Sequence, residues 1–410
     1  MFNRHNGVFS LIQWFFWSGF GIIFSYLTPY YQEIGFSSVQ IGLFMGLASF
    51  ANILGQLVLG WFADKAHSPG VIIRFSLLLG ALTSLGLYLT PPVLAPVVIL
   101  SFVLSFFTQS LPPLVDSWTM SIRRTTPNLD YGITRAMGSI GFAVTNVAAG
   151  ILLDRWGLVQ VFPMGAILMI AGTIIISLTQ HVYKVEKFVS PSETPFEDLP
   201  EDSPPIQHPT KFFSPEMVSI LPIFFLTFVA FRPTHVFTPI LIQQLGGTNE
   251  QIGYSFAVMA ISEVPFMVAS TFLLKKFTDT KILFVAFIFY VFRIGMPAFA
   301  QTSNQIVLFQ LFQGPSFGLF LPAAVHFMFR IAPEGKKTLA QTASSLTTFG
   351  IGSIAGSTLG GYMADWFGLR IMYGVSAGIM IVTLLLFTKL FILPKTDTRQ
   401  ASNPSTPNPG

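Results

Sequence analysis

Two opposite charges stand inside otherwise apolar stretches, on either side of a short polar connection. Asp116 follows the apolar run 97–114, and Arg135 lies near the start of the next apolar run. If both runs are membrane helices, each charge lies about five residues inside the end of its helix that flanks the polar connection. This depth is roughly 6–8 Å at 1.5 Å per residue. A lone charge in a membrane is costly, so opposite charges at similar depth favour an ion pair and a functional polar site. The alternative is a pair that only holds two helices together.

The second half of the chain holds the other charges within apolar runs. They are one acid, Glu263, and two bases, Arg232 and Arg293. An acid that contacts both a solute and a movable positive partner is able to couple transport to protons. Glu263 is the better candidate for that role, because Asp116 has Arg135 at matching depth to keep it ionised. The alternative is a permanent ion pair of Glu263 with one of the two bases.

The composition shows what kind of protein carries these charges. Of the 410 residues, 52% are hydrophobic and only 10% are charged, whereas soluble domains carry about 25% charged residues. Such a chain cannot cover a water-facing surface and must be an integral membrane protein. It has no cysteine, which excludes disulfides, iron–sulfur clusters and cysteine-based metal sites. The sequence shows no nucleotide-binding loop, metal-ligand cluster or nucleophile–base pair, so neither an enzyme, a cofactor nor a nucleic-acid partner is expected.

Runs of about 20 mostly apolar residues are long enough to cross a membrane. Twelve such runs are found, at 8–30, 39–62, 71–91, 94–121, 132–153, 159–182, 214–244, 248–274, 281–300, 305–331, 337–364 and 370–393. The acidic, proline-rich stretch 183–213 reads as a hydrophilic linker, and the polar stretch 394–410 reads as a disordered tail. The expected organisation is therefore an N-terminal six-helix half at 1–182, the linker, a C-terminal six-helix half at 214–393, and the tail.

The lysines and arginines orient these helices. If both ends of the chain are cytoplasmic, 17 of the 22 basic residues fall in cytoplasmic loops and ends. Arg155 and Arg370 fall on the outside, and the other three, Arg135, Arg232 and Arg293, fall within the runs. This distribution obeys the positive-inside rule. It predicts a multi-pass protein of the cytoplasmic membrane with both termini and the linker in the cytoplasm.

The two halves repeat each other. The segment at 150–158 matches the segment at 361–369 at an offset of 211, and a neighbouring offset of 210 sets His326 at the position of Asp116. Parallel six-helix halves typically place a solute site between them near the middle of the membrane. His326 is thus a titratable candidate for proton coupling, although its position near the cytoplasmic end favours a structural role.

Aromatic and small residues occupy other parts of these helices. Trp14, Trp17 and Tyr26 on the first run either line the solute site or face lipid and pack. Small residues recur along the fifth and eleventh runs, at 138–150 and 350–361. They let helix backbones approach closely, and we expect them to pack between helices that slide.

Residues 60–74, GWFADKAHSPGVIIR, close the second run at the cytoplasmic face. Gly60 would permit close helix packing there, and Asp64 would meet a neighbouring helix end or a basic residue. The segment resembles the loop 2–3 signature of the major facilitator superfamily, Gly-x-x-x-Asp-Arg/Lys-x-Gly followed by basic residues. Gly60, Asp64 and Lys65 match that signature, while His67 stands at its second glycine. The resemblance implies that the three matching residues take part in gating.

The segment PPLVDSW, followed by GITRAMGSIGFA, narrows the resemblance. It is similar to helices 4 and 5 of the lactose permease and phenylpropionate permease branch, the oligosaccharide:proton symporter-like group. In that branch an acid on helix 4 and an arginine on helix 5 bind the solute, and an aromatic residue lies two turns beyond the arginine. The resemblance implies that Asp116, Arg135 and Phe142 bind the solute. Phe142 replaces a tryptophan that stacks on galactose, which speaks against galactoside specificity.

The resemblance continues on helices 8 to 10. Glu263 matches the acid of helix 8, and Arg293 matches the arginine of helix 9. On helix 10, Gln310 and Gln313 replace the histidine and the glutamate of the sugar permease. Neither glutamine can carry a proton. The resemblance therefore implies solute binding by Arg293 and the two glutamines. Proton coupling is left to three candidates: Glu263, Arg232 and His326.

The predicted fold is an all-α membrane protein of twelve transmembrane helices in two parallel six-helix repeats, the major facilitator fold. Charges at the expected site sum to +1 when both acids are ionised, which suits a neutral sugar or nucleoside and slightly favours an anion such as an aromatic carboxylate. We expect a monomer that couples uptake of such a solute to protons by alternating access, with the lipid bilayer as its surroundings. The alternatives are a drug or metabolite exporter of the same fold, and a receptor that transports nothing.

Overall fold

The computed structural model describes residues 4–66, 68–179, 183, 214–333 and 336–393. These residues are almost entirely helical and contain no β-strand. Eleven helices among them are long and apolar enough to cross a membrane. The twelfth expected run, 337–364, is a helical path in which a π-helical segment joins two α-helices. The predicted all-α fold of twelve spanning helices is therefore confirmed.

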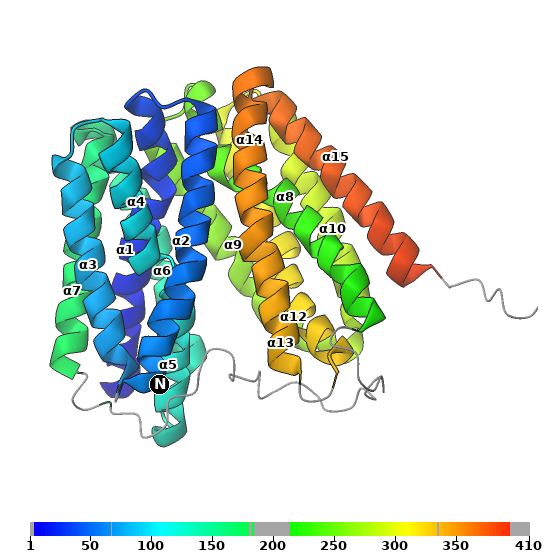
Figure 1. Cartoon of the computed structure of the whole chain (residues 1–410), viewed down its shortest axis with the longest axis horizontal. Coiled ribbons are helices and arrows are strands. Elements are labelled where there is room, and N and C mark those ends of the chain that lie inside the picture. The colour runs from blue at the N-terminus through cyan, green and yellow to red at the C-terminus, as the bar shows by residue number, and fades with distance from the viewer. Residues whose placement is uncertain (1–3, 67, 180–182, 184–213, 334–335, 394–410) are drawn as a thin grey trace, which may run out of the picture.

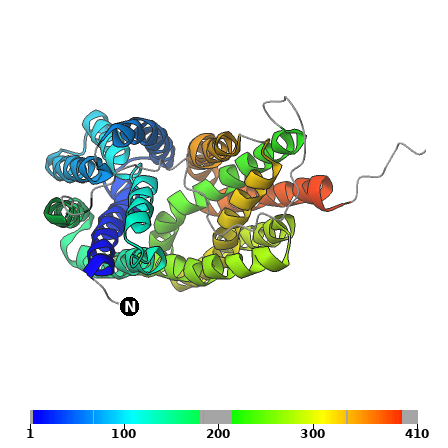
Figure 2. The same ribbon diagram turned by 90° about the horizontal axis from the view of Figure 1, so that it is seen from below.

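The helices fall into two groups (Figure 2), here called the N-terminal half, residues 4–179, and the C-terminal half, residues 214–393. The N-terminal half contains α1 (Arg4–Glu33), α2 (Ser38–Lys65), α3 (Pro69–Leu89), α4 (Leu94–Thr108), α5 (Pro112–Thr125), α6 (Tyr131–Trp156), η1 (Leu158–Gln160) and α7 (Val161–Thr179). The C-terminal half contains α8 (Pro215–Gln244), α9 (Asn249–Lys276), α10 (Asp279–Gly295), η2 (Met296–Phe299), α11 (Ser303–Phe309), η3 (Gln310–Phe312), η4 (Gly314–Gly318), α12 (Leu319–Ile331), α13 (Lys337–Ser345), η5 (Leu346–Gly352), α14 (Ser353–Phe367), α15 (Leu369–Phe387) and η6 (Thr388–Ile392). The expected linker, apart from Tyr183, and the expected tail lie outside the described residues, so those boundaries stay predictions.

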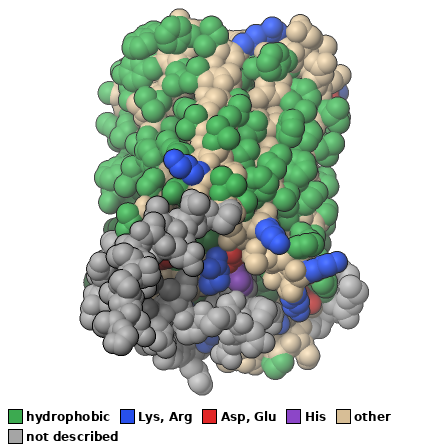
Figure 3. Space-filling model, turned by 90° about the vertical axis from the view of Figure 1, so that its right-hand side faces the viewer, with side chains coloured by type: hydrophobic (Ala, Val, Ile, Leu, Met, Phe, Trp, Pro, Cys, Tyr) green, Lys and Arg blue, Asp and Glu red, His purple; other side chains and the backbone are tan. Residues whose placement is uncertain are grey.

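Apolar side chains cover the flank of the molecule. Figure 3 shows hydrophobic side chains over most of one face, while charged side chains are more numerous toward its lower end. Large aliphatic and aromatic residues such as Leu57, Ile167 and Phe272 are 64%, 66% and 68% exposed. Exposed apolar surface of this extent is what a protein surrounded by lipid tails presents.

The repeated segment Gln-Ile-Gly begins one helix in each half. Ser37 precedes α2 and Thr248 precedes α9, and each hydroxyl accepts a hydrogen bond from the backbone N–H of the glutamine three residues later. The glutamine side chain accepts a bond from the backbone of the capping residue in return. Such a capping box satisfies two N–H groups that a helix start otherwise leaves unpaired. The sequence repeat therefore has a local cause: it fixes the same helix start in both halves.

Two of the expected runs are interrupted by proline. The run expected at 94–121 consists of α4 and α5, and α5 begins at Pro112. The run expected at 305–331 passes through η3 and the π-helical η4, which contains Pro315. Proline has no N–H and clashes with the preceding turn, so it breaks or reshapes a helix at these points. As a result Asp116 lies in the second turn of a helix, and not deep within a continuous one.

Glycines bring the two halves together at one end, where α2 and α9 begin. Helix α2 packs on α14, and α6 packs on α9. A Cβ atom added to Gly42 would lie 2.5 Å from the Ser357 carbonyl oxygen, and one added to Gly361 would lie 2.6 Å from the Ser38 carbonyl oxygen. The halves separate toward the other end, where α5 and α13 lie (Figure 1). The expected packing role of small residues on the fifth and eleventh runs is seen at this closed end.

Candidate functional site

Asp116 and Arg135 lie together, as the sequence predicted. The Nε atom of Arg135 is 4.0 Å from Oδ1 of Asp116, and the side chains are 31% and 30% exposed. Helix α1 supplies a third member, because the Gln13 amide donates a hydrogen bond of 3.3 Å to the same Asp116 oxygen. Trp17, one turn later, donates from its indole N–H to Gln13 at 2.9 Å. The pair on α5 and α6 is therefore oriented from α1.

Trp17 also holds the arginine directly. The guanidinium carbon of Arg135 lies 4.2 Å from the centre of the Trp17 ring, a cation–π contact. The same guanidinium donates to the Ser139 hydroxyl at 3.1 Å. A Cβ atom on Gly138 would lie 2.5 Å from the Trp17 ring, so only glycine leaves room for the indole at this point. Sequence reasoning left Trp17 undecided and missed Gln13, a fully buried amide one turn before a tryptophan.

Phe142 lies two turns beyond Arg135, but it is only 7% exposed. Its ring centre is 6.5 Å from that of Phe256 on α9, and it fills the space beside Gly21 on α1. Most of the ring is thus used in packing between helices. In this conformation the aromatic face next to Arg135 belongs to Trp17.

Glu263 on α9 is held by Gln313, one of the two glutamines that the sequence assigned to the solute. The Gln313 amide donates a hydrogen bond to the Glu263 carboxylate. Gly314 permits this approach, because any Cβ there would collide with the Ser262 carbonyl and the Phe266 ring on α9. Gln310 instead accepts a bond of 3.3 Å at its backbone oxygen from the Ser262 hydroxyl. The π-helical turn that follows Gln313 is a feature often found at functional sites.

The cations that act on Glu263 come from both halves. Arg293 on α10 and Arg135 on α6 are its positive neighbours, yet neither approaches within ion-pair distance in the described part of the chain. Arg232 makes no ion pair with Glu263 among the described residues either. The permanent ion pair considered for Glu263, with Arg232 or Arg293, is therefore not formed in this conformation. The pair of the N-terminal half and the acid of the C-terminal half face the same region between the halves.

Arg232 and Arg293, the two arginines considered as partners of Glu263, contact the faces of aromatic rings. The guanidinium of Arg293 is 4.8 Å from the centre of Phe231, and that of Arg232 is 5.6 Å from the centre of Phe24 on α1. Arg293 is only 6% exposed. Among the described residues, one buried guanidinium nitrogen of each arginine has no hydrogen-bond partner.

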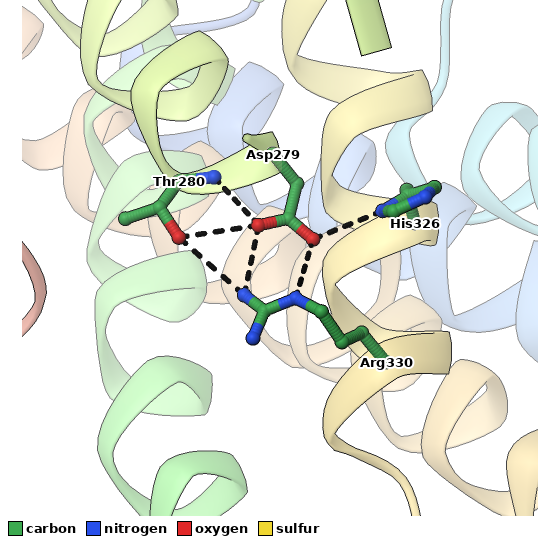
Figure 4. A network of polar contacts seen from close by, with 4 residues as sticks. All are labelled: Asp279, Thr280, His326 and Arg330. Carbon is green, nitrogen blue, oxygen red and sulfur yellow. Dashed lines mark hydrogen bonds and ion pairs between the residues drawn. The ribbon is translucent and has the colours of Figure 1, made fainter. Parts of the chain in front are cut away.

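His326 belongs to a different cluster. Its Nδ1 lies 2.9 Å from the carboxylate of Asp279, and Arg330 donates to both oxygens of that carboxylate at 2.8 Å (Figure 4). Asp279 begins α10 and is 2% exposed. The structure therefore places His326 with Asp279 and Arg330, and does not bring it to Glu263. Sequence reasoning missed Asp279 because it lies two residues before the expected run; the spacing of His326 and Arg330, one helical turn apart, was the available signal.

The three residues of the loop 2–3 signature lie at the end of α2. Lys65 stacks on Trp61, with its ammonium 3.6 Å from the ring centre, and both Asp64 and Lys65 are exposed. A Cβ atom on Gly60 would meet no atom within 4 Å. The close helix packing expected at Gly60 is thus absent in this conformation.

Comparisons with known proteins agree with this architecture. The chain is 26% identical to a maltose permease of Geobacillus stearothermophilus over 93% of this chain and 94% of that protein. It is 22% identical to a probable 3-phenylpropionic acid transporter of Escherichia coli over 92% of this chain and 94% of that protein. The fold is that of the nucleoside transporter NupG, with a TM-score of 0.76, 15% identity, and coverage of 96% of this chain and 100% of that chain.

Residues 8–375 match the MFS_1 like family. The match covers most of the chain and includes both halves with their polar clusters. The two relatives named above are transporters, not enzymes, which fits a protein that crosses the membrane many times and handles a small molecule. The chain thus belongs to the MFS_1 like family of major facilitator superfamily transporters.

Proposed function

We propose that this protein couples the movement of one small organic solute to protons by alternating access. The observation that carries the proposal is the arrangement of two polar pairs, Asp116 with Arg135 and Glu263 with Gln313, which come from different halves and face one region. The solute is a sugar, a nucleoside or an aromatic acid, the classes named for the relatives. A single chain acts as the transporter, in a cytoplasmic membrane with both ends inside. An exporter of the same fold is the alternative.

The test of this function begins with the solute. The purified protein is heated with maltose, uridine or 3-phenylpropionate, and a solute that binds the native state raises the melting temperature. Each solute that does so is then offered to proteoliposomes that contain the protein. Solute uptake that exceeds the uptake by protein-free liposomes supports transport. If no solute of the three classes is taken up, the protein does not transport what we propose.

The orientation of the protein gives a separate prediction. Because most basic residues must lie inside, Ser192 in the linker is expected to be cytoplasmic. The native chain lacks cysteine, so a Ser192→Cys variant has one reactive thiol. An impermeant maleimide should label it in inside-out vesicles and not in intact cells. Labelling from outside intact cells would refute this topology.

The closed end is held by more than glycine packing. Both oxygens of the Asp154 carboxylate, at the end of α6, accept hydrogen bonds from the first backbone N–H groups of α9, at 2.8 Å from Asn249 and 3.0 Å from Glu250. Tyr26 on α1 lies between the same helices, with its hydroxyl 2.8 Å from the Asn146 carbonyl oxygen and 3.1 Å from the Asn249 carbonyl oxygen. A carboxylate at a helix start is favourable, since unpaired N–H groups and the positive dipole end meet there. The hydrogen bonds of Asp154 and Tyr26 to the start of α9 cross between the halves, so they must break if the halves part at this end.

Replacing Asp154 with Asn should therefore favour opening of this end. The variant loses the negative charge and one hydrogen-bond acceptor. The closed state is then less stable by about 1.5 kcal/mol, which shifts the equilibrium between the closed and open states roughly tenfold. A cysteine at Ala257, a buried residue one turn after Gly253 on α9, reports the opening by its labelling rate. Asp365 is the matched control, because it is the repeat partner of Asp154 and makes no hydrogen bond to the start of α2 in the described structure. Equal labelling rates in the Asp154→Asn and Asp365→Asn variants would show that the carboxylate does not hold this end closed.

A further inference from the structure

We infer that the transported solute carries an anionic group, and that Arg232 and Arg293 bind this group between the two halves. The inference rests on the proposed function, because it concerns the same solute site. It narrows the three solute classes to one, an organic anion whose body is apolar or aromatic. It also gives Arg232 a part in binding the solute, in place of the proton-coupling role considered from the sequence.

The first observation is that both arginines lack acceptors. Arg293 is 6% exposed, and its Nη1 has no hydrogen-bond partner; the Nε of Arg232 is likewise buried without one. Neither forms an ion pair with any described residue. The faces of Phe231 and Phe24 attract these cations but cannot accept an N–H hydrogen bond along the guanidinium plane. A buried charge without a partner is rare inside a membrane protein and marks a solute or ion path.

The second observation is the state of the nearby acids. Asp116 is engaged by Arg135 and Gln13, and Glu263 is engaged by Gln313. With both acids ionised, the region between the halves still holds one more positive than negative charge; a proton on Glu263 raises that excess to two. Arg330, by contrast, has the carboxylate of Asp279 in a two-bond fork. Arg232 and Arg293 lack the acceptor that this arginine has, and a carboxylate on the solute would supply it.

The third observation is the surface around the two cations. His235, one turn after Arg232 on α8, is a neighbour of both arginines in electrostatic terms. Its ring centre lies 5.4 Å from Phe24 on α1, 5.7 Å from Phe231 and 5.8 Å from Phe256 on α9. Rings from both halves therefore surround the cations. An anion with an aromatic or alkyl body can pack on these rings while its charged end meets the guanidinium groups. The hydroxyl groups of a neutral sugar can accept hydrogen bonds from the guanidinium groups but bring no negative charge to balance them.

A matched pair of probes tests this inference: 3-phenylpropionate and 3-phenylpropanamide, which share a shape and differ in charge. We expect the carboxylate to raise the melting temperature of the purified protein and the amide to leave it unchanged. Arg232→Gln and Arg293→Gln should each weaken carboxylate binding by roughly 10-fold or more, as the loss of a charge-assisted hydrogen bond predicts. Arg370→Gln is the control, since Arg370 binds the Ala300 carbonyl at 3.0 Å and lies at the closed end.

A second measurement needs no ligand. A buried arginine without a counter-charge destabilises the solute-free protein. Arg293→Met should therefore raise the melting temperature measured without solute by about 2 °C or more. If the amide, maltose or uridine stabilises the wild type as well as the carboxylate does, the inference is wrong. It is equally wrong if no carboxylate binds and Arg293→Met lowers the melting temperature. Uptake of maltose or uridine alone would refute the anion and leave the proposed transport intact, whereas no uptake of any solute would refute the transport itself.

Discussion

Replacing Asp116 with Asn or Arg135 with Gln is expected to abolish solute binding and to leave folded protein in the membrane. The two side chains are about one-third exposed between the halves, and a partly exposed ion pair contributes only about 0–1 kcal/mol to folding. Arg135 keeps its contacts with Trp17 and Ser139 when Asp116 becomes neutral. If the solute forms hydrogen bonds with the charged side chains, each substitution lowers its binding free energy by about 1.5–3 kcal/mol. This loss corresponds to a 10-fold to over 100-fold weaker affinity.

The measurement is equilibrium binding to the purified variants, with whichever solute stabilises the wild type. Asp130→Asn is the matched control for the acid. Asp130 caps α6 by accepting a bond of 3.0 Å from the Ile133 N–H, a role that asparagine also fills. Arg155→Gln, an exposed change at the end of the same helix, is the control for the base. Near-normal transport by either site variant would show that the pair only holds helices together. Loss of folded protein would point to the same structural role.

The sequence was sufficient to predict the spanning helices and the approach of Asp116 to Arg135. Hydropathy over about 20 residues averages out local detail, and charges at similar depth on consecutive helices have few other partners. It was not sufficient to predict how each helix is rotated. Gln13 and Trp17 complete the site because α1 turns that face toward α5 and α6, and no pattern along α1 alone specifies that rotation.

Helix boundaries explain the other differences. Asp279 lies two residues before the expected run 281–300, but α10 begins with it, and its carboxylate binds His326 and Arg330 on α12. The position of Gln313 assigned it to the solute, but in this conformation its side-chain amide donates a hydrogen bond to Glu263. Which end of the molecule is closed also depends on the balance between two packings of the same glycines, so it could not be deduced from their spacing.

Glu263→Gln is expected to abolish uphill accumulation driven by a pH gradient while solute binding and downhill exchange remain. Glu263 accepts a hydrogen bond from Gln313, which a glutamine side chain can still accept. Its positive neighbours belong to different halves, Arg293 to its own half and Arg135 to the other. When the halves move, the distance from Glu263 to Arg135 must change, and with it the balance between the protonated and ionised carboxyl group. That alternation is what a proton carrier requires.

The measurement is uptake by proteoliposomes with and without an imposed gradient. A gradient of one pH unit can drive about tenfold accumulation in a one-proton symporter, because it stores about 1.4 kcal/mol. The Glu263→Gln variant should equilibrate the solute and accumulate none, and Glu33→Gln, the same change at the exposed end of α1, should behave as the wild type. If Glu263→Gln still concentrates the solute, the proton travels by another group. If the wild type does not respond to the gradient at all, the transporter is a facilitator or uses another ion, and Glu263 serves to hold Gln313 and to balance Arg293.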